Sequence, residues 1–203
     1  MSAPREPAPC PMHGSLIEQK AALRERVRAT VRELTRAQRD EAAVELCARL
    51  IEQPVWKNAC SVLLFSPLPD EPNVRPLLYA ALGSNKVTAL PRFSPATRDY
   101  EAALIQDPET DLREGKFGIL EPGPLCKVGD LNRLDLVLVP GVAFDWHGRR
   151  LGRGRGYYDR LLAAVSGKTC GVAFDQQRVA AIPVEPHDVP LNCILTPSHW
   201  LEL

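Results

Sequence analysis

The chain has 203 residues, of which 45% are hydrophobic and 25% are charged, as is usual for one globular domain. Its 25 basic residues balance its 25 acidic residues, so it lacks the overall positive field of most nucleic-acid-binding proteins. Six scattered cysteines show neither zinc-site nor disulfide spacing, which fits a reducing compartment. No apolar run approaches the roughly 20 residues of a membrane span. We therefore expect a cytoplasmic monomer that binds neither nucleic acid nor membrane.

The first residues differ in composition from the rest of the chain. Four of the first eleven are proline, and the segment lacks the apolar centre of a secretory signal. We therefore expect residues 1–14 to be a flexible proline-rich leader and residues 15–203 to form a single domain.

Two helices are predicted after the leader. Apolar residues recur at helical spacing in the first of them; they are Leu16, Leu23, Val27, Val31 and Leu34. Ser15 and Glu18 form a capping box at its start. A second helix is expected from Thr35 to Glu52, ending before Pro54, because proline disfavours continuation of a helix.

Two basic residues of the first helix lie on or beside its apolar stripe. At about 100° per residue Lys20 falls on the stripe and Arg24 on its edge. The Lys20 ammonium either extends along the apolar surface to reach water or points inward toward an anion. The sequence leaves both interpretations open.

The remaining elements alternate between strands and helices. Strands are predicted at 61–65, 86–90, 100–105, 134–144, 169–174 and 189–197, and helices at 73–83 and 157–165. This order predicts an α/β fold, a single-domain three-layer α/β/α architecture with a mostly parallel open sheet, Rossmann-like. Ligands bind such sheets at the carboxyl ends of the strands. We expect the loops at 66–72, 91–94 and 141–156 to meet there.

The stretch GRRLGRGRGYYDR, at residues 148–160, follows the most apolar strand and precedes a helix. Its glycines allow positive φ and close approach of a ligand to the backbone, while its arginines match phosphate oxygens. The stretch matches neither the GxxxxGK[ST] loop nor the GxGxxG fingerprint. We interpret it as a site for a di- or triphosphate; the alternative is an arginine-glycine surface loop that touches RNA without sequence specificity.

Two aspartates could accompany the phosphates. Asp159 falls in the first turn of the helix after the stretch, and Asp188 lies in a later loop. Magnesium bound by one or two carboxylates would relieve their repulsion from phosphate oxygens. The alternatives are that Asp159 only complements the helix dipole and that Asp188 is a solvated turn residue.

Several segments, in order, resemble the 5-formyltetrahydrofolate cyclo-ligase (5,10-methenyltetrahydrofolate synthetase) family. They are KAALR, LPDE, KFGILEP, LVLVPGVAFDWHGRRLGRGRGYYDR and VEPHDVPLNCILT, and together they cover roughly residues 16–197. The long segment is specific by itself, whereas the others are informative mainly through their order. Residues 15–203 would then be a cyclo-ligase-like α/β domain.

The resemblance implies an ATP- and Mg²⁺-dependent ring closure of 5-formyltetrahydrofolate. The formyl oxygen would take the γ-phosphoryl group, N10 would attack the activated carbon, and 5,10-methenyltetrahydrofolate, ADP and phosphate would form. Such chemistry depends on positioning and charge neutralisation, which arginines and backbone amides supply. Two alternatives remain: a nucleotide-binding relative without folate activity, and RNA binding through the arginine-glycine loop.

The resemblance also implies roles for individual residues. The ATP contacts would be Lys20, Arg24, Arg149, Arg150, Leu151, Gly152, Arg153, Gly154, Arg155, Gly156 and Tyr157. Catalysis would fall to Arg153, Arg155 and Tyr157, and folate binding to Ser66, Glu71, Phe117 and Tyr157. Magnesium would be held by Asp159 and Asp188. Two positions depart from the family pattern, because Asn192 stands where aspartate is frequent and Arg155 where lysine is frequent.

Overall fold

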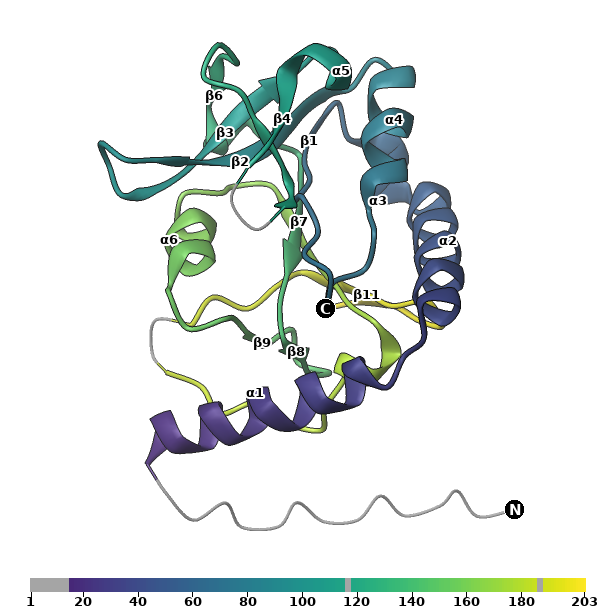
Figure 1. The fold of residues 1–203 in the computed structure, drawn as a ribbon, viewed down its shortest axis with the longest axis vertical. Coiled ribbons are helices and arrows are strands. Elements are labelled where there is room, and N and C mark those ends of the chain that lie inside the picture. Colours follow the sequence, from purple (N-terminus) through teal and green to yellow (C-terminus); the bar gives the residue numbers. More distant parts are fainter. Residues whose placement is uncertain (1–14, 116–117, 186–187) are drawn as a thin grey trace.

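The structure, a computed structural model, describes residues 15–115, 118–185 and 188–203. It contains an eight-stranded sheet with the order β12-β11-β10-β7-β1-β2-β3-β6 (Figure 1). The five central strands are parallel: β11 (Cys193–Leu195), β10 (Lys168–Val172), β7 (Leu136–Pro140), β1 (Ser61–Leu63) and β2 (Val87–Ser94). Antiparallel strands flank them: β12 (Trp200–Glu202) at one edge, and β3 (Asp99–Ile105) followed by the edge strand β6 (Val128–Gly129) on the other side. The predicted mostly parallel α/β sheet is thus confirmed.

Helices cover both faces of the sheet. They are α1 (Leu16–Arg32), α2 (Arg36–Glu52), α3 (Pro54–Asn58), α4 (Arg75–Gly83), α5 (Pro108–Asp111) and α6 (Tyr157–Ala163). Helices α2, α3 and α4 lie on one face and α6 on the other, while α1 runs across the end of the molecule where β7 terminates (Figure 1). The predicted capping box of Ser15 with Glu18 is present, and Thr35 and Gln38 form a second one at the start of α2. Within the described residues no helix is long and apolar enough to cross a membrane.

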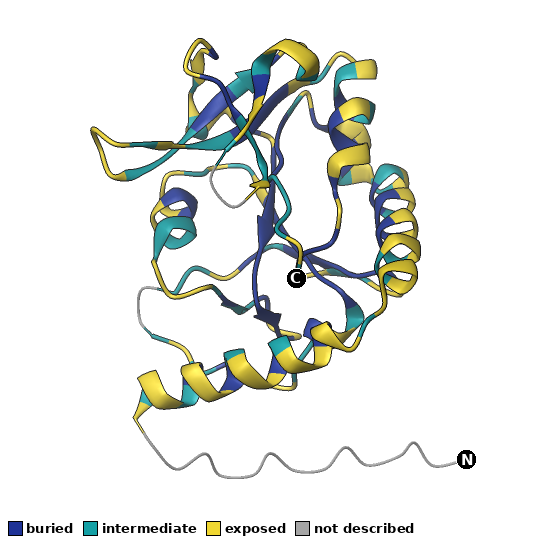
Figure 2. Cartoon of the chain, in the orientation of Figure 1, coloured by how far each residue is buried: buried dark blue, intermediate teal, exposed yellow. Residues whose placement is uncertain are grey.

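Strand β7 lies at the centre of the core, and all five of its residues are buried (Figure 2). Leu136 and Leu138 pack with the cluster under α2 and α4, whereas Val137 and Val139 pack with the cluster under α6. This alternation follows from the two-residue period of a strand, and the continuous apolar run follows from coverage on both faces.

The predicted strand 134–144 is too long at its carboxyl end. Strand β7 stops at Pro140, and the chain then forms a separate hairpin of β8 (Ala143–Phe144) and β9 (Arg150–Leu151). The buried Gln177 amide donates to the carbonyls of Gly141 and Val142, at 2.8 and 3.2 Å, which holds this backbone away from the main sheet. The hairpin returns the glycine-arginine stretch to the end of β7, because the backbone N–H of Val142 donates to the carbonyl of Leu151 at 2.7 Å.

Residues 91–94 are strand and not the predicted loop. They continue β2, which pairs with β3 as far as Ser94 opposite Asp99. Aromatic rings on the two strands, Phe93 and Tyr100, meet edge to face with centroids 6.2 Å apart. Cross-strand aromatic contacts of this kind favour the extension. A second small hairpin, β4 (Leu112–Glu114) with β5 (Leu120–Pro122), lies beside β2 and β3.

Candidate functional site

A buried carboxylate shapes the turn that begins the glycine-arginine stretch. Asp145 is 1% exposed, and its Oδ1 accepts the backbone N–H groups of His147 and Arg149 at 2.9 and 3.1 Å. Its Oδ2 accepts from the backbone of Ile182 at 3.2 Å. These bonds fix the β8–β9 turn, because a buried carboxylate is stable only when its oxygens are hydrogen-bonded. The sequence analysis did not single out Asp145.

Three glycines of the stretch, Gly148, Gly154 and Gly156, have the positive φ that was expected there. Gly154 has φ = 96° and Gly156 has φ = 67°, a region that residues with a Cβ rarely adopt. Gly156 is the N-cap of α6. Arg24 of α1 donates from Nε to the carbonyl of Gly152 at 2.9 Å. The first helix and the glycine-arginine loop therefore lie side by side, as the assigned roles require.

Lys20 points inward toward anions and does not extend to water. It is 8% exposed, and its Nζ donates to Glu185 at 2.7 Å and to Asp188 at 2.9 Å. Burial alone lowers the pKa of the ammonium, but the two carboxylates outweigh this effect, so the pKa is raised. Lys20 and Asp188, which are 168 residues apart in sequence, are thus in direct contact. Glu185 was not predicted, although it lies only three positions before Asp188.

Arg153 connects the glycine-arginine loop to the loop after β1. Its Nη2 donates to Asp70 at 2.6 Å and to Glu71 Oε1 at 2.9 Å, and its Nε donates to the same Glu71 oxygen at 3.2 Å. The Glu71 side chain is 5% exposed, and its Oε2 accepts from the backbone of Leu68 at 3.0 Å. Burial raises the pKa of Glu71 despite the nearby arginine. The loops at 66–72 and 141–156 therefore meet, as expected.

Asp159 is likewise paired with a cation. Its carboxylate accepts from the guanidinium of Arg150, whose side chain is 5% exposed. The Arg150 guanidinium also lies over the ring of Tyr158, 5.7 Å from its centroid. Leu151 is buried in the cluster under α1, so any contact of this residue with a ligand would be through its backbone.

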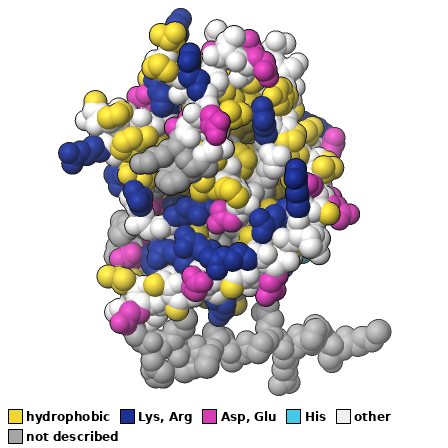
Figure 3. Space-filling model, in the orientation of Figure 1, with side chains coloured by type: hydrophobic (Ala, Val, Ile, Leu, Met, Phe, Trp, Pro, Cys, Tyr) yellow, Lys and Arg dark blue, Asp and Glu magenta, His cyan; other side chains and the backbone are white. Residues whose placement is uncertain are grey.

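Basic and acidic side chains alternate across the face that carries these loops. Figure 3 shows a band of lysine and arginine side chains above α1, with acidic side chains between them. Arg155 is exposed in the loop and Arg149 is partly exposed. Such a face can bind phosphates through its cations and hydrogen-bond donors or a metal through its acids.

Tyr157 begins α6 and lies in an aromatic group. Its ring meets those of Phe93 and Tyr100 edge to face, with centroids 5.7 and 5.2 Å away. The Arg160 guanidinium lies 5.1 Å from the centroid of the Tyr157 ring. Arg160 in turn donates to Asp99 at 2.9 Å. The ring is thereby held at the boundary between α6 and the β2–β3 hairpin.

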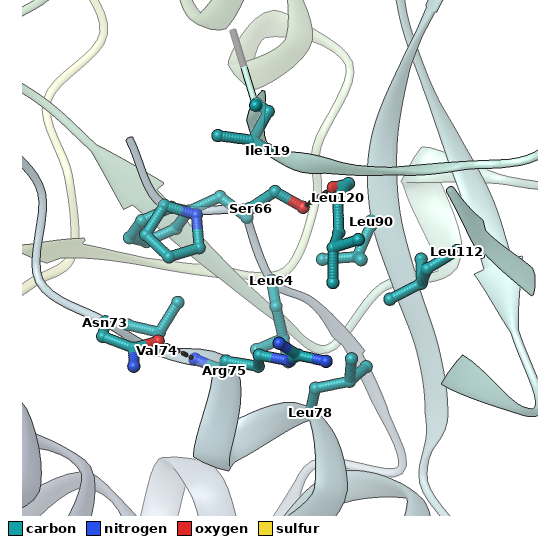
Figure 4. A pocket seen from close by; sticks show the side chains of 13 residues that line it. Leu64, Ser66, Asn73, Val74, Arg75, Leu78, Leu90, Leu112, Ile119 and Leu120 are labelled. Carbon is teal, nitrogen blue, oxygen red and sulfur yellow. Dashed lines mark hydrogen bonds between the residues drawn. The ribbon is translucent and has the colours of Figure 1, made fainter. Parts of the chain in front are cut away.

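Ser66 lies at the wall of a cavity of about 250 Å³. Its hydroxyl donates to the carbonyl of Leu120, and most of the other lining side chains are apolar (Figure 4). Glu71 belongs to the same loop as Ser66 but turns toward Arg153. Phe117, the third predicted folate contact, lies outside the described residues.

Asn192 has a structural role in place of a metal-binding one. Its Oδ1 accepts from the backbone N–H and the hydroxyl of Thr169, at 2.8 and 3.0 Å. These bonds join the segment before β11 to the first residues of β10.

The acids present fit magnesium through their chemistry. Asp159 and Asp188 offer hard carboxylate oxygens, and Mg²⁺ ordinarily takes one or two of these with phosphate oxygens and water. Among residues 15–115, 118–185 and 188–203 no three His, Cys, Asp or Glu side chains gather as a complete protein metal site. In this structure each of the two carboxylates is paired with a cation, Asp159 with Arg150 and Asp188 with Lys20.

Known proteins are similar to this chain over most of its length. The 5-formyltetrahydrofolate cyclo-ligase family model matches residues 16–197. A 5-formyltetrahydrofolate cyclo-ligase of Haemophilus influenzae is 35% identical over 84% of this chain and 91% of its own length. The Escherichia coli protein of that name is 33% identical over 85% of this chain and 97% of its own. The solved 5,10-methenyltetrahydrofolate synthetase of Aquifex aeolicus superposes with a TM-score of 0.81 at 32% identity, covering 91% of this chain and 92% of that one.

Proposed function

Because the chain belongs to the 5-formyltetrahydrofolate cyclo-ligase family, we propose that it uses ATP to close 5-formyltetrahydrofolate into 5,10-methenyltetrahydrofolate. Family membership makes the chain an enzyme, a ligase of folate metabolism. The products besides the folate are ADP and inorganic phosphate.

The reaction divides into two steps. The formyl oxygen attacks the γ-phosphorus of ATP, the bond to the β–γ bridging oxygen breaks, and ADP leaves. N10 then attacks the activated formyl carbon and loses its proton. The carbon–oxygen bond breaks, so the former formyl oxygen departs with phosphate and a methenyl bridge joins N5 to N10.

One observation supports the proposal above the others: the contact of Arg153 with Glu71. A cation of the nucleotide loop lies within 2.9 Å of a carboxylate assigned to the folate. The two ligands must meet for phosphoryl transfer, since catalysis of this reaction consists chiefly of positioning and charge neutralisation. A guanidinium between them can serve both requirements.

The nucleotide would be bound by the loop and the first helix. Lys20, Arg24 and the stretch from Arg149 to Tyr157 provide ammonium, guanidinium and backbone N–H donors. Arg153 and Arg155 would neutralise charge on the transferred phosphoryl group, and Tyr157 would position the formyl group beside it. Asp159 and Asp188 would hold Mg²⁺, which when bound neutralises phosphate charge.

The folate would be bound on the other side of Arg153. The Glu71 carboxylate would accept from the amino and ring N–H groups of the pterin, while Ser66 and the rings of Phe117 and Tyr157 would border it. The Glu71 side chain is 5% exposed, so a pterin bond there would be shielded from water.

The test is direct. Purified protein is mixed with ATP, Mg²⁺ and 5-formyltetrahydrofolate, and the absorbance of the methenyl product is followed. Product that requires all three components supports the proposal. ATP binding without product under any divalent ion would favour a nucleotide-binding relative without folate activity. Tight, salt-sensitive RNA binding would favour RNA binding through the arginine-glycine loop.

A further inference from the structure

Among the described residues that line the cavity beside Ser66, Arg75 is the charged one (Figure 4). We propose that Arg75 binds a carboxylate of the substrate's glutamate tail and so makes the enzyme selective for glutamate-bearing folates. This inference rests on the proposed function. The apolar part of the wall consists mainly of Leu64, Leu78, Leu90, Leu112, Ile119 and Leu120.

The guanidinium of Arg75 is available for an anion. Figure 4 shows it turned toward Leu64 and Leu78, with Ile119 on the opposite side of the cavity. Its polar partner is the Tyr79 hydroxyl at 3.3 Å, and within the described ranges it forms no ion pair. Arg150 and Arg153, by contrast, are both paired with carboxylates.

Helix stability does not explain an arginine at this position. Arg75 is the first residue of α4, after the N-cap Val74. A cation at a helix N-terminus opposes the helix dipole, which favours anions there. A bound carboxylate would satisfy the guanidinium and the helix start together.

The groups in the cavity wall and those beside the cavity match the parts of a folate. Such a molecule has a pterin at one end, an apolar aminobenzoyl ring in the middle and a dicarboxylate at the other end. Glu71, next to the cavity, offers an acceptor for the pterin and Arg75, in its wall, a cation for the tail, and the four Cα–Cα steps from one to the other span at most about 14 Å. One elongated ligand can reach both.

The volume of the cavity fits the middle of this molecule. At about 250 Å³ it is smaller than the roughly 300–1,000 Å³ of pockets that enclose a whole ligand. It therefore takes an aromatic portion and leaves the charged tail at its edge, where Arg75 and the exposed Tyr79 lie.

The experiment compares two substrates that differ only in the tail, 5-formyltetrahydrofolate and 5-formyltetrahydropteroate, which lacks the glutamate. For Arg75→Gln we expect the KM of the glutamate-bearing substrate to rise at least tenfold and its kcat to stay within twofold, because a charge-assisted pair is lost. The KM of the pteroate should stay within twofold. Arg75→Lys should recover part of the loss, and Arg26→Gln, an exposed arginine of α1, should match the wild type.

The outcomes separate this inference from the proposed function. An equal rise of KM for both substrates overturns the role of Arg75. A lowered Tm of Arg75→Gln together with loss of activity on both substrates also overturns it, because a structural role would then explain the loss. Wild-type protein that closes neither substrate would contradict the proposed function itself.

Discussion

The guanidinium of Arg153 donates twice to Oε1 of Glu71, at 2.9 and 3.2 Å. Arg153 of the nucleotide loop and Glu71 of the folate loop thus spend on each other the charges that would bind a phosphate and a pterin. A phosphate that engages Arg153 leaves the Glu71 carboxylate to accept hydrogen bonds from a pterin. Binding of one ligand should therefore assist binding of the other, and thermodynamic linkage makes this assistance reciprocal.

We predict that 5-formyltetrahydrofolate binds at least about fivefold more tightly when a non-hydrolysable ATP analogue is present, within the usual range of coupling between sites. In Arg153→Gln the ratio of the two Kd values should approach one, while Arg26→Gln should retain it. Isothermal titration with and without the analogue measures both values. A ratio near one in the wild type, or an undiminished ratio in Arg153→Gln, would refute the coupling.

Arg155 should be the more important of the two catalytic arginines for rate. It is exposed in the loop and forms no ion pair with the residues that the structure describes, so its full charge is available to the phosphoryl group. Arg155→Ala should lower kcat/KM by at least two orders of magnitude, about 3 kcal/mol. Arg155→Lys keeps the charge without the planar fork and should lose far less. Steady-state rates of both variants measure these effects. A near-wild-type kcat/KM of Arg155→Ala would show that Arg155 has no catalytic role.

Asp159→Asn should raise the Mg²⁺ concentration needed for half-maximal rate. The amide can still accept from Arg150, but it has no charge for the ion. Removing that charge also leaves the buried Arg150 guanidinium uncompensated, so we expect the Tm to fall. Asp40→Asn, in an exposed ion pair of α2, is the matched control. An unchanged Mg²⁺ titration would show that Asp159 is not a ligand.

Asp135 should stabilise the fold in a pH-dependent way. Its Oδ2 accepts from the backbone of Cys60 and Ser61, each at 2.8 Å, and so joins the starts of β1 and β7. Slight burial raises its pKa, but these bonds and the Ser61 hydroxyl outweigh the effect and hold the pKa below the usual 3.8. A lowered pKa means stabilisation that is present above pH 3.8 and lost as the pH falls through the folded value.

Asp135→Asn should therefore lower the free energy of unfolding at pH 7 by about 1 kcal/mol, a value reduced for the exposure of the group. The difference from the wild type should shrink as the pH falls below 3.8. Urea unfolding at neutral and acid pH measures it, with Asp40→Asn again as the control. A difference that stays constant across this range would contradict the linkage.

Local signals in the sequence predicted most of the helices and central strands. The capping boxes of α1 and α2 lie within four residues, and the burial of β7 follows from its own apolar run. The errors come from contacts between distant segments. Gln177 ends β7 by binding carbonyls about 35 positions away, and β3 extends β2 through residues predicted as a loop.

In the candidate site, too, local signals were read correctly and contacts between distant segments were missed. The positive φ of the glycines follows from residue type, whereas helical spacing placed Lys20 on the apolar stripe and left the direction of its ammonium open. The partners Asp70 and Glu185 were not assigned roles, because ion pairs across 83 and 165 residues leave no periodic signal. Their only signal was proximity in sequence to predicted carboxylates.

Transfer of the γ-phosphoryl group of ATP to the formyl oxygen can be followed with substrate that carries ¹⁸O in the formyl group. The phosphate released in a single turnover is analysed by mass. If the formyl oxygen accepts the phosphoryl group, each phosphate contains one ¹⁸O atom. Unlabelled phosphate, with the label recovered in water, would contradict this transfer.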